Sequence, residues 1–383
     1  MNNPQDSSSE VELREWLSQW PLIQKEYDNF SIKLQRREIH SAYEAANKTI
    51  SLLTHILDET SLTNYTQLIS NIRKLAYCLL RKQPMSLSIG SVTLRFISII
   101  EQETVAAYKR MGRYGITASF GNSLSSMFNE KLTVDMMMKQ LEDESALKSC
   151  IRDAIQEEIA YDIENAAEEI SQYGSHFIHY DDVVITYGQS KAVSAFLQAA
   201  NEAHQTKHVK VICCETYPSL VGQQFALELS KKGISTLLIH DAAAFTVMSR
   251  CNKVVIGCHA VLANGGVLVP SGGYNIVLAA LHSKVPVIVL TGMYKLYPQF
   301  CSDQTTINDI DSPNHIMPYS LCDSQLAEVD VVNPVYDYIP PEYISLLLTT
   351  KGKYAPSYIF RLMKDNYTDE DILQSLNSRF DNN

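Results

Sequence analysis

Apolar residues in the first half of the chain recur at the spacing of amphipathic helices. Between residues 61 and 82, the positions Leu68, Ile72, Leu75 and Leu79 fall on one helical face. The next segment repeats the pattern, with apolar side chains at 92, 96, 99 and 100. The pattern predicts an N-terminal helical domain over residues 1–170. Residues 110–130 interrupt it with several glycines and serines, and we expect a mobile loop there.

The last helix of this half combines an apolar stripe with an acidic surface. The stripe consists of isoleucines at 151, 155, 159, 163 and 170, and the rest of the surface is rich in Asp and Glu. A run of charges usually marks a solvated face. The alternative is an acidic docking face for a basic partner, and the pattern leaves both interpretations open.

After His179 the hydrophobic period changes. Short β-branched runs at 183–186, 209–213, 236–239, 254–256 and 285–290 alternate with helical runs at 191–202, 220–231 and 275–282. Near-continuous apolar strands separated by helices are typical of a parallel sheet that is covered on both faces. We therefore predict an α/β fold, in which a Rossmann-like, doubly wound domain over residues 171–383 follows the helical domain. Ligands of such domains bind at the carboxyl ends of the strands.

Composition and charge narrow the function classes. The 383 residues include 32 Lys and Arg against 43 Asp and Glu, so the formal net charge is −11. Because phosphate backbones are bound through clustered Lys and Arg, we expect no direct binding of nucleic acid. No apolar run reaches the roughly 18 residues of a membrane helix, and we expect neither a membrane span nor a signal peptide. Eight cysteines without a CxxC pair indicate free thiols and a cytoplasmic protein of the cytosol.

Standard catalytic and cofactor motifs are missing from the chain. There is no Walker-type phosphate loop, no GxGxxG after the first strand, no GxSxG turn and no zinc-ligand spacing, so we expect no cofactor and no metal. Asp241 precedes three alanines and is predicted to cap a helix N-terminus. Cys258 and His259 are neighbours after a strand and point in opposite directions, which favours structural roles for both.

The strand-end segments together resemble a known family. They read DVVITYG at 182–188, ETYP at 215–218, GISTLLIHD at 233–241 and VVIGCHAVLANGG at 254–266. Their order and spacing are similar to the regulatory subunits of eukaryotic translation initiation factor 2B and to the related methylthioribose-1-phosphate and ribose-1,5-bisphosphate isomerases. Within the family the beta subunits are most similar, through the segments at 241–253, 293–300, 333–342 and 355–362.

The chain departs from the isomerases at the positions that the resemblance marks as catalytic. Gly188 replaces the isomerase cysteine, and His259 replaces the isomerase aspartate. Tyr217 stands at an arginine position, and Val269-Pro270 stand at an Asn-Lys pair near the sugar phosphate. Moving a proton between carbons needs a positioned acid and base, so we expect no catalytic residues here. A divergent sugar-phosphate (aldose-ketose) isomerase remains the alternative function.

The resemblance implies a non-catalytic regulatory subunit of the guanine-nucleotide exchange factor for initiation factor 2. Its implied partners are the alpha, gamma, delta and epsilon subunits, with delta closest through the α/β domains, and initiation factor 2 itself. Such a subunit helps sense phosphorylation of the alpha subunit of factor 2 and so controls translation initiation in the stress response. Under this interpretation Asp153, Glu157 and Glu158 face a basic loop of factor 2 alpha.

Aromatic residues near the C-terminus are candidates for a subunit interface. The candidates are Tyr336, Tyr338, Tyr358 and Phe360, with Tyr343 beside them in the sequence. Tyrosine is enriched where proteins bind one another. Intramolecular packing is the alternative for the same rings, and the sequence leaves both open.

Overall fold

The computed structural model describes residues 4–110, 144–203, 209–301, 308–321 and 329–367. The chain divides into two compact units. The first comprises Met1–Ile163 and Lys364–Asn383, and the second comprises Glu164–Met363. The limits expected from the sequence, 1–170 and 171–383, differ from this division within one helix and at the C-terminal residues, and they stay a prediction. Most of the expected loop at 110–130 lies outside the described residues.

The first unit is helical, and its helices form where the 3.6-residue pattern predicts them. The helices are α1 (Pro4–Leu17), α2 (Pro21–Gln35), α3 (Ala42–Glu59), α4 (Tyr65–Lys82), α5 (Leu87–Arg110) and α7 (Glu144–Ile155), and the turn η1 (Leu62–Asn64) precedes α4. The predicted face of α4 is buried, because Leu68, Ile72, Leu75 and Leu79 are at most 4% exposed. A π-helical turn, η2 (Gln156–Ala160), connects α7 to α8 (Tyr161–Ser171). The isoleucine stripe along α7, η2 and α8 is buried as predicted.

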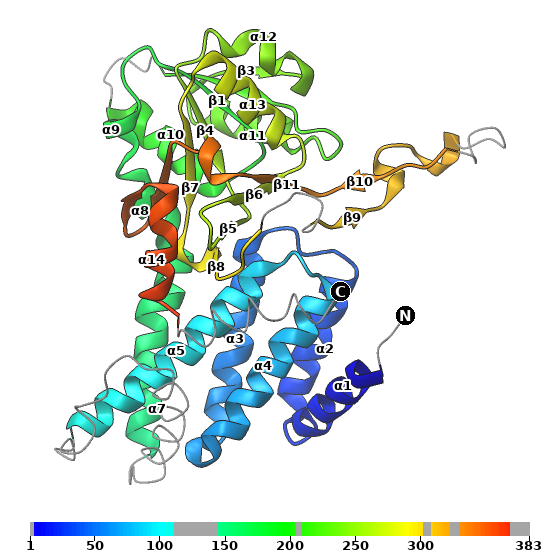
Figure 1. Cartoon of the computed structure of the whole chain (residues 1–383), viewed down its shortest axis with the longest axis vertical. Helices are drawn as coiled ribbons and strands as arrows, with labels where there is room; N and C mark the ends of the chain where they lie inside the picture. Colours follow the sequence, from blue (N-terminus) through cyan, green and yellow to red (C-terminus); the bar gives the residue numbers. More distant parts are fainter. Residues whose placement is uncertain (1–3, 111–143, 204–208, 302–307, 322–328, 368–383) are drawn as a thin grey trace. The chain divides into compact units, whose positions relative to one another are not determined.

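The second unit is built on a mostly parallel sheet (Figure 1). Its strands are β1 (Val183–Thr186), β2 (Lys210–Cys214), β3 (Ser235–Ile239), β4 (Lys253–Gly257), β7 (Val287–Thr291), β12 (Leu346–Thr349) and β13 (Gly352–Tyr354). Within the described residues they follow the order β13-β12-β7-β4-β1-β2-β3, and only β13 is antiparallel to its neighbour. The order reverses direction between β1 and β4, which confirms the predicted doubly wound fold. The crevice where such folds bind ligands therefore lies at the ends of β1 and β4.

Helices and short elements connect the strands of this unit. The connecting helices are α9 (Gly174–Phe177), α10 (Lys191–Ala203), α11 (Val221–Lys231), α12 (Ala244–Met248), α13 (Gly273–Ser283) and α14 (Ile359–Lys364), the last of which ends at the boundary with the first unit. The 3-10 turns are η3 (Asp241–Ala243), η4 (Met293–Lys295), η5 (Pro313–His315), η6 (Tyr319–Leu321), η7 (Pro341–Tyr343) and η8 (Pro356–Tyr358). The three helices predicted from the sequence correspond to α10, α11 and α13.

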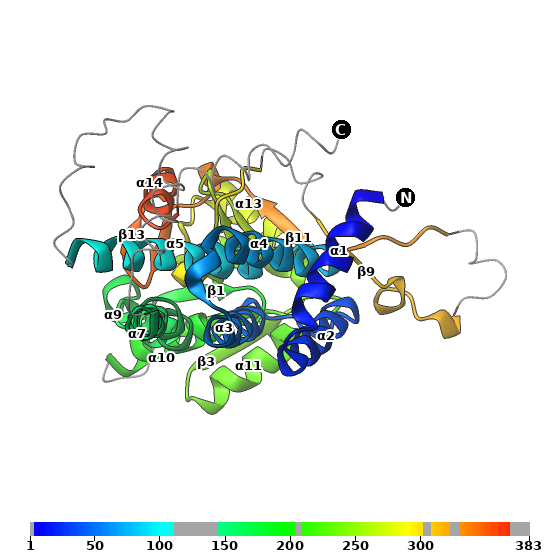
Figure 2. The same cartoon turned by 90° about the horizontal axis from the view of Figure 1, so that it is seen from below.

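Two smaller sheets accompany the central one. A four-stranded sheet has the order β11-β6-β5-β8 and uses β5 (Ala260–Leu262), β6 (Val267–Pro270), β8 (Leu296–Tyr297) and β11 (Tyr336–Ile339). An antiparallel ribbon pairs β9 (Ile310–Asp311) with β10 (Asn333–Pro334). In both views this ribbon extends away from the sheets of its own unit (Figures 1 and 2). The sequence did not predict these strands, because runs of two to four residues carry no clear period.

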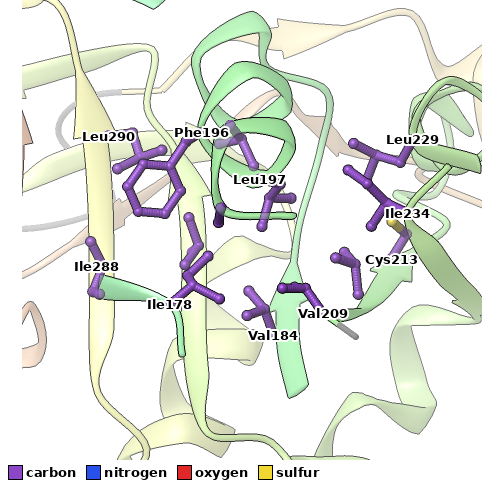
Figure 3. Close-up of a cluster of buried hydrophobic side chains, with 14 of the residues drawn as sticks. Ile178, Val184, Phe196, Leu197, Val209, Cys213, Leu229, Ile234, Ile288 and Leu290 are labelled. Carbon is purple, nitrogen blue, oxygen red and sulfur yellow. The ribbon is translucent and has the colours of Figure 1, made fainter. Parts of the chain in front are cut away.

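The core of the second unit lies between the central sheet and two of its helices (Figure 3). Phe196 and Leu197 of α10 and Leu229 of α11 pack on strand residues such as Val184 and Leu290, all of them fully buried. Burial of each such side chain contributes about 1.5–3 kcal/mol relative to exposure. This core holds the strand ends in place, and the strand ends carry the candidate site.

Candidate functional site

The end of β1 carries a glycine whose backbone conformation disfavours other residues. Gly188 has a φ of +72°, and its N–H donates to Thr216 Oγ1 at 3.1 Å. A Cβ added at Gly188 would lie 3.5 Å from Pro270 Cγ, which is an ordinary contact distance. The left-handed backbone, rather than lack of space, is therefore what disfavours a cysteine at this position. The structure places the predicted Gly188 at the crevice, with no side chain to offer.

His259 follows β4 and is engaged by its own chain. Its ring centroid lies 4.6 Å from that of Tyr336, and its Nε2 lies 3.4 Å from the Tyr336 hydroxyl. Its backbone N–H donates to Leu268 O at 2.7 Å. The position that is a catalytic aspartate in the isomerases is thus part of an aromatic pair with β11. The neighbouring Cys258 is buried, so the two side chains have separate environments as expected.

Asp241 does not cap a helix, and that prediction was wrong. Its carboxylate accepts hydrogen bonds from the backbone N–H groups of Thr216, at 3.0 Å, and Tyr217, at 2.8 Å. Both donors lie in the loop after β2, which reaches the neighbouring end of β3. Thr216 itself has a φ of +61°, so Asp241 stabilises a backbone conformation that non-glycine residues seldom adopt. The carboxylate is a brace between two strand ends.

Thiols near the strand ends are not activated. Burial raises the pKa of Cys213 to about 12 and that of Cys251 to about 11. Burial likewise raises the pKa of Cys214 and of Cys258. A nucleophilic cysteine needs a lowered pKa, because the thiolate is the reactive form. These four thiols therefore stay protonated at neutral pH and fill space in the core.

The N-terminus of α13 receives a carboxylate from the chain itself. Asp337 of β11 accepts the backbone N–H groups of Gly272, at 2.8 Å, and of Tyr274, at 3.1 Å, with the same oxygen. The Tyr187 hydroxyl donates to Ser271 O beside them. Burial raises the pKa of Asp337, and the two N–H donors oppose that effect. A helix N-terminus that would otherwise attract an anion is thus already satisfied.

The predicted interface tyrosines separate into buried and exposed groups. Tyr336 and Tyr338 are 7% and 5% exposed, and the Tyr338 hydroxyl donates to Cys301 O at 3.1 Å and accepts from Asn264 at 2.7 Å. For these two rings the structure favours the alternative of intramolecular packing, because a side chain buried in its own chain offers little area to a partner. Tyr358 is 39% exposed, and Phe360 is half-buried against Phe300. Their role as anchors stays a prediction.

The acidic helix, which comprises α7, η2 and α8, contains carboxylates in ion pairs and carboxylates that are exposed to solvent. Asp153 and Glu157 are exposed and lie one turn apart. Glu158 forms an ion pair with Arg95, which also donates to Asn366 O at 3.0 Å. Arg152, beside Asp153, is bound by Asp58. Arg95 and Arg152, the basic side chains next to the acidic face, thus bind Glu158 and Asp58. Asp153 and Glu157 are therefore the two predicted residues best placed to contact a partner.

One conspicuous surface was not predicted from the sequence. Leu237 and Leu238, 55% and 44% exposed, lie on β3, the edge strand of the central sheet. Phe245 of α12, which is 59% exposed, follows β3 through η3, and α13 packs on α12. We use the name apolar edge surface for the exposed side chains Leu227, Leu237, Leu238, Phe245 and Leu281, of which Leu237 and Leu238 point to opposite faces at the edge of the sheet. Exposed apolar groups that gather on adjacent elements mark interaction sites.

A groove lies between α12 and α13 on this surface. Its volume is about 470 Å³, and its lining includes Asp241, Phe245, Asn275 and Leu278. The Phe245 ring packs 5.1 Å from that of His282 and closes one side. A mostly apolar groove with two polar groups suits a side chain of a partner better than a sugar phosphate, which needs cations or several donors. No signal in the sequence marks the groove, because residues from separate segments form it.

A known protein family and several known proteins are similar to this chain. The model of the initiation factor 2 subunit family (IF-2B) matches residues 38–356. The chain belongs to this family. Translation initiation factor eIF2B subunit beta of Dictyostelium discoideum is 32% identical over 378 residues, which cover 91% of this chain and 96% of that one. Ribose 1,5-bisphosphate isomerase of Pyrococcus furiosus is 32% identical over 210 residues, 55% of this chain and 64% of the isomerase.

Solved structures show the same fold. A chain of the tetrameric eIF2B-beta2-delta2 complex from C. thermophilum superposes with a TM-score of 0.66 at 23% identity, over 90% of this chain and 95% of that one. The family thus contains initiation-factor subunits and isomerases on one scaffold. The resemblance to this family is confirmed, and so is the α/β fold. The strand-end residues of this member are engaged with each other.

Two further observations concern the site and its surroundings. Among the described residues, no group of three or more His, Cys, Asp or Glu side chains could hold a metal ion. Over the same ranges, every helix is too short or too polar to span a lipid bilayer. The remaining candidates for a functional role are surface residues, on the acidic helix of the first unit and on the apolar edge surface of the second.

Proposed function

We propose that this chain is a beta-type regulatory subunit of initiation factor 2B, the exchange factor for initiation factor 2, and acts in the cytosol without catalysing a reaction itself. The relatives that are eIF2B beta subunits are 32% and 29% identical over about nine tenths of the chain, whereas the ribose 1,5-bisphosphate isomerase of Thermococcus kodakarensis, which matches a similar share, is 26% identical. The engaged strand ends support the same choice. Gly188 has no acid or base, and His259 is paired with Tyr336.

The apolar edge surface is the observation that carries this proposal. A regulatory subunit must bury surface against its siblings, and Leu237, Leu238 and Phe245 are large apolar side chains that nothing in the described chain covers. Full burial of each would contribute about 1.5–3 kcal/mol. We assign the surface to a delta-type sibling, since a related structure is a complex of beta and delta subunits. The alpha, gamma and epsilon subunits would complete the assembly.

Affinity purification of the tagged chain from its own cells, followed by native mass measurement, tests the proposal. A large complex that contains a delta-type sibling is expected. Leu238→Asp and Phe245→Asp should each reduce recovery of that sibling at least tenfold, because a charge would be desolvated in the interface. Leu22→Asp is the matched control, since Leu22 is 84% exposed on α2. A homodimer of about twice the mass of one 43.1 kDa chain would overturn the proposal and call for an isomerase assay.

The acidic helix supports a second part of the proposal, contact with the alpha subunit of factor 2. Asp153 and Glu157 are exposed one turn apart, and Glu158 next to them is paired with Arg95. An acidic face attracts a basic loop at long range. A phosphate on that loop adds about −1.5 to −2 charges, and the same face then repels it. Asp153 and Glu157 would thereby report the phosphorylation state of factor 2.

Charge reversal tests this second part separately. Asp153→Lys with Glu157→Lys, in the complete complex, should weaken binding of unphosphorylated factor 2 about tenfold, which corresponds to 1.4 kcal/mol. The same change should weaken binding of phosphorylated factor 2 less. Glu15→Lys with Glu38→Lys is the control, because it changes net charge equally at exposed positions elsewhere in the first unit. Unchanged affinity for unphosphorylated factor 2, in an intact complex, would reduce the acidic helix to a solvated surface.

A further inference from the structure

The ribbon of β9 and β10 has one apolar face that is exposed. Its register pairs Pro334 with Ile310 and Asn333 with Asp311. Opposite residues of an antiparallel pair share a face, and so do residues two apart, so Ile310, Val332 and Pro334 lie on one side. All three are exposed, Ile310 by 60% and Val332 by 63%, whereas Asn333 of the other side is buried. The ribbon therefore turns its apolar side outward.

The ribbon is held firmly at its root. Asn308 donates to Tyr336 O at 2.7 Å and accepts the Tyr336 N–H at 3.1 Å. The Val335 N–H donates to Asp309 O at 2.9 Å, and the Ser271 N–H donates to Val335 O at 2.9 Å. These bonds join both strands to the four-stranded sheet. In both views the ribbon then extends away from that sheet (Figures 1 and 2).

A second attachment comes from Tyr217. Its hydroxyl donates to Ile316 O at 3.2 Å, in the turn after η5. Tyr217 lies in the loop after β2, whose N–H groups Asp241 binds. The isomerases have an arginine at this position of the Glu-Thr-Arg-Pro segment. In this chain the residue that replaces it contacts the projecting segment, so the loop braces the ribbon.

A two-stranded ribbon needs a further surface to pack against. Two antiparallel strands without further packing are marginally stable in water. Within the described residues, no part of the chain covers Ile310 or Val332, and Tyr319 beyond β9 is 64% exposed as well. An apolar face on a fixed projection is typical of a docking surface. We call residues 308–321 and 329–335 the arm.

The charge of the arm indicates what it binds. Its sequence contains Asp309, Asp311 and Asp330 and neither Lys nor Arg. Such a segment is repelled by nucleic acid and by anionic lipid. A second copy of this chain, with a net charge of −11, is also a poor match. The partner that fits is a different protein with an apolar patch flanked by Lys and Arg.

We propose that the arm docks onto a basic, apolar surface of another protein in the same assembly, with Ile310 and Val332 as the apolar contacts and Tyr217 as a positioning residue. This surface is separate from the apolar edge surface and from the acidic helix. The proposal goes beyond the proposed function, because it assigns a contact that neither the sibling interface nor the sensing of factor 2 requires.

Site-specific photo-crosslinking identifies the occupant. A photoreactive phenylalanine at Val332 or at Tyr319, in the complex purified from its own cells, should crosslink to one protein other than this chain. The linked peptide should carry at least two Lys or Arg residues. A photoreactive residue at Leu22, 84% exposed, is the control and should not give this product. Crosslinking to a second copy of this chain, to an acidic peptide or to no protein would overturn the proposal.

Affinity measurements with the linked peptide, made synthetically, test the chemistry. Fluorescence anisotropy with the full chain should show about tenfold weaker binding for Val332→Ser and for Asp330→Lys, and weaker binding at higher salt. Tyr217→Phe should weaken binding about threefold, because the arm loses one brace but none of its contacts. Tyr180→Phe, at another exposed tyrosine of this unit, should have no effect. Unchanged affinity for Val332→Ser, with the circular dichroism of the folded chain retained, would contradict the docking role.

The arm and the sibling interface can be told apart in one experiment. Val332→Ser should leave recovery of the delta-type sibling unchanged and abolish the crosslink from a photoreactive residue at Tyr319. Leu238→Asp should do the opposite. If Val332→Ser releases the delta-type sibling to the same extent as Leu238→Asp, the arm has no partner surface of its own, whatever the outcome for the proposed function.

Discussion

The centre and the edge of the central sheet contain the same types of apolar residue, but these residues are buried at the centre and exposed at the edge. At the centre, Val184 and Ile185 of β1 and Val255 of β4 are 0% exposed. At the edge, Leu237 and Leu238 of β3 are 55% and 44% exposed, although β3 pairs with β2 in regular parallel register. The strands are similar in sequence and in backbone. They differ in whether helices of the same chain cover them.

The centre and the edge of the sheet therefore differ in what they offer to other molecules. Beside the strand ends, Asp241 after β3 binds the loop after β2, and Asp337 of β11 binds the N-terminus of α13. The edge has no chemistry, but it has uncovered apolar area. Uncovered area on a folded chain is available for association, at about 25 cal/mol for each Å² buried. Burial of apolar side chains at the centre of the sheet therefore stabilises the fold, whereas the exposed apolar area at the edge can stabilise a complex.

The largest expected effect compares one side chain from each region. Phe196 is fully buried in the central core, so Phe196→Ala should lower the free energy of unfolding by about 3–5 kcal/mol. Leu238→Ala at the edge should change it by no more than about 0.5 kcal/mol, because the side chain is already in water. Urea unfolding of the purified chain measures both. Similar losses for the two variants would mean that the edge is part of the core.

The next effect concerns the end of β1. Gly188→Cys places a side chain on a residue with a φ of +72°, which should cost about 1–2 kcal/mol of stability. Combined with His259→Asp, it restores the two isomerase side chains. We expect no turnover of a sugar phosphate, because the strained backbone and the contacts of Tyr336 do not position an acid and a base. Gly352→Cys, also at a positive φ but away from the crevice, controls for backbone strain. Measurable isomerase activity of the double variant would show that only two side chains separate this chain from the enzymes.

The smallest effect is a pH dependence at α13. Burial raises the pKa of Asp337 in the folded chain above its unfolded value of about 3.9. Its stabilising contribution is therefore complete below the unfolded pKa and declines as the pH rises through the folded pKa. Asp337→Asn has no such titration and keeps an acceptor for the Gly272 and Tyr274 N–H groups. The unfolding free energy of the natural chain minus that of the variant should fall as the pH rises above the unfolded pKa of about 3.9. A difference that is constant with pH would contradict the assigned shift.

Much of the fold could be predicted because the order of apolar and polar residues within each strand and helix identifies that element. Val183–Thr186 is β1 as predicted, and the other four predicted strands agree with β2, β3, β4 and β7 to within two residues at each end. Each is an apolar run between helical segments, so neighbours in the sequence decide it. The strands β5, β8, β9 and β10 are short, and pairing with distant segments stabilises them. The order of apolar and polar residues within a short segment does not show which distant segment it pairs with.

The candidate site was predicted less completely, for the same reason. Gly188 and His259 could be named from the resemblance, but their inertness depends on Thr216 and Tyr336, far away in the sequence. Asp241 was predicted to cap the residues that follow it, and it binds the loop after β2 instead. Local capping and tertiary bonding compete for the same carboxylate, and the sequence shows only the first. Glu158 was grouped with its acidic neighbours, and Arg95 on another helix distinguishes it.

The sequence by itself determined that this chain has a helical part and a parallel α/β part, and it predicts that the set of isomerase residues is incomplete. Those properties depend on the period of apolar positions and on the identity of single residues, both of which are local. Only the tertiary structure decided that Leu237 and Leu238 are exposed, that Tyr336 and Tyr338 are buried, and that the ribbon presents Ile310 outward. Exposure depends on which distant segments cover a residue. Strand order and long-range hydrogen bonds set that coverage, and no window of sequence contains them.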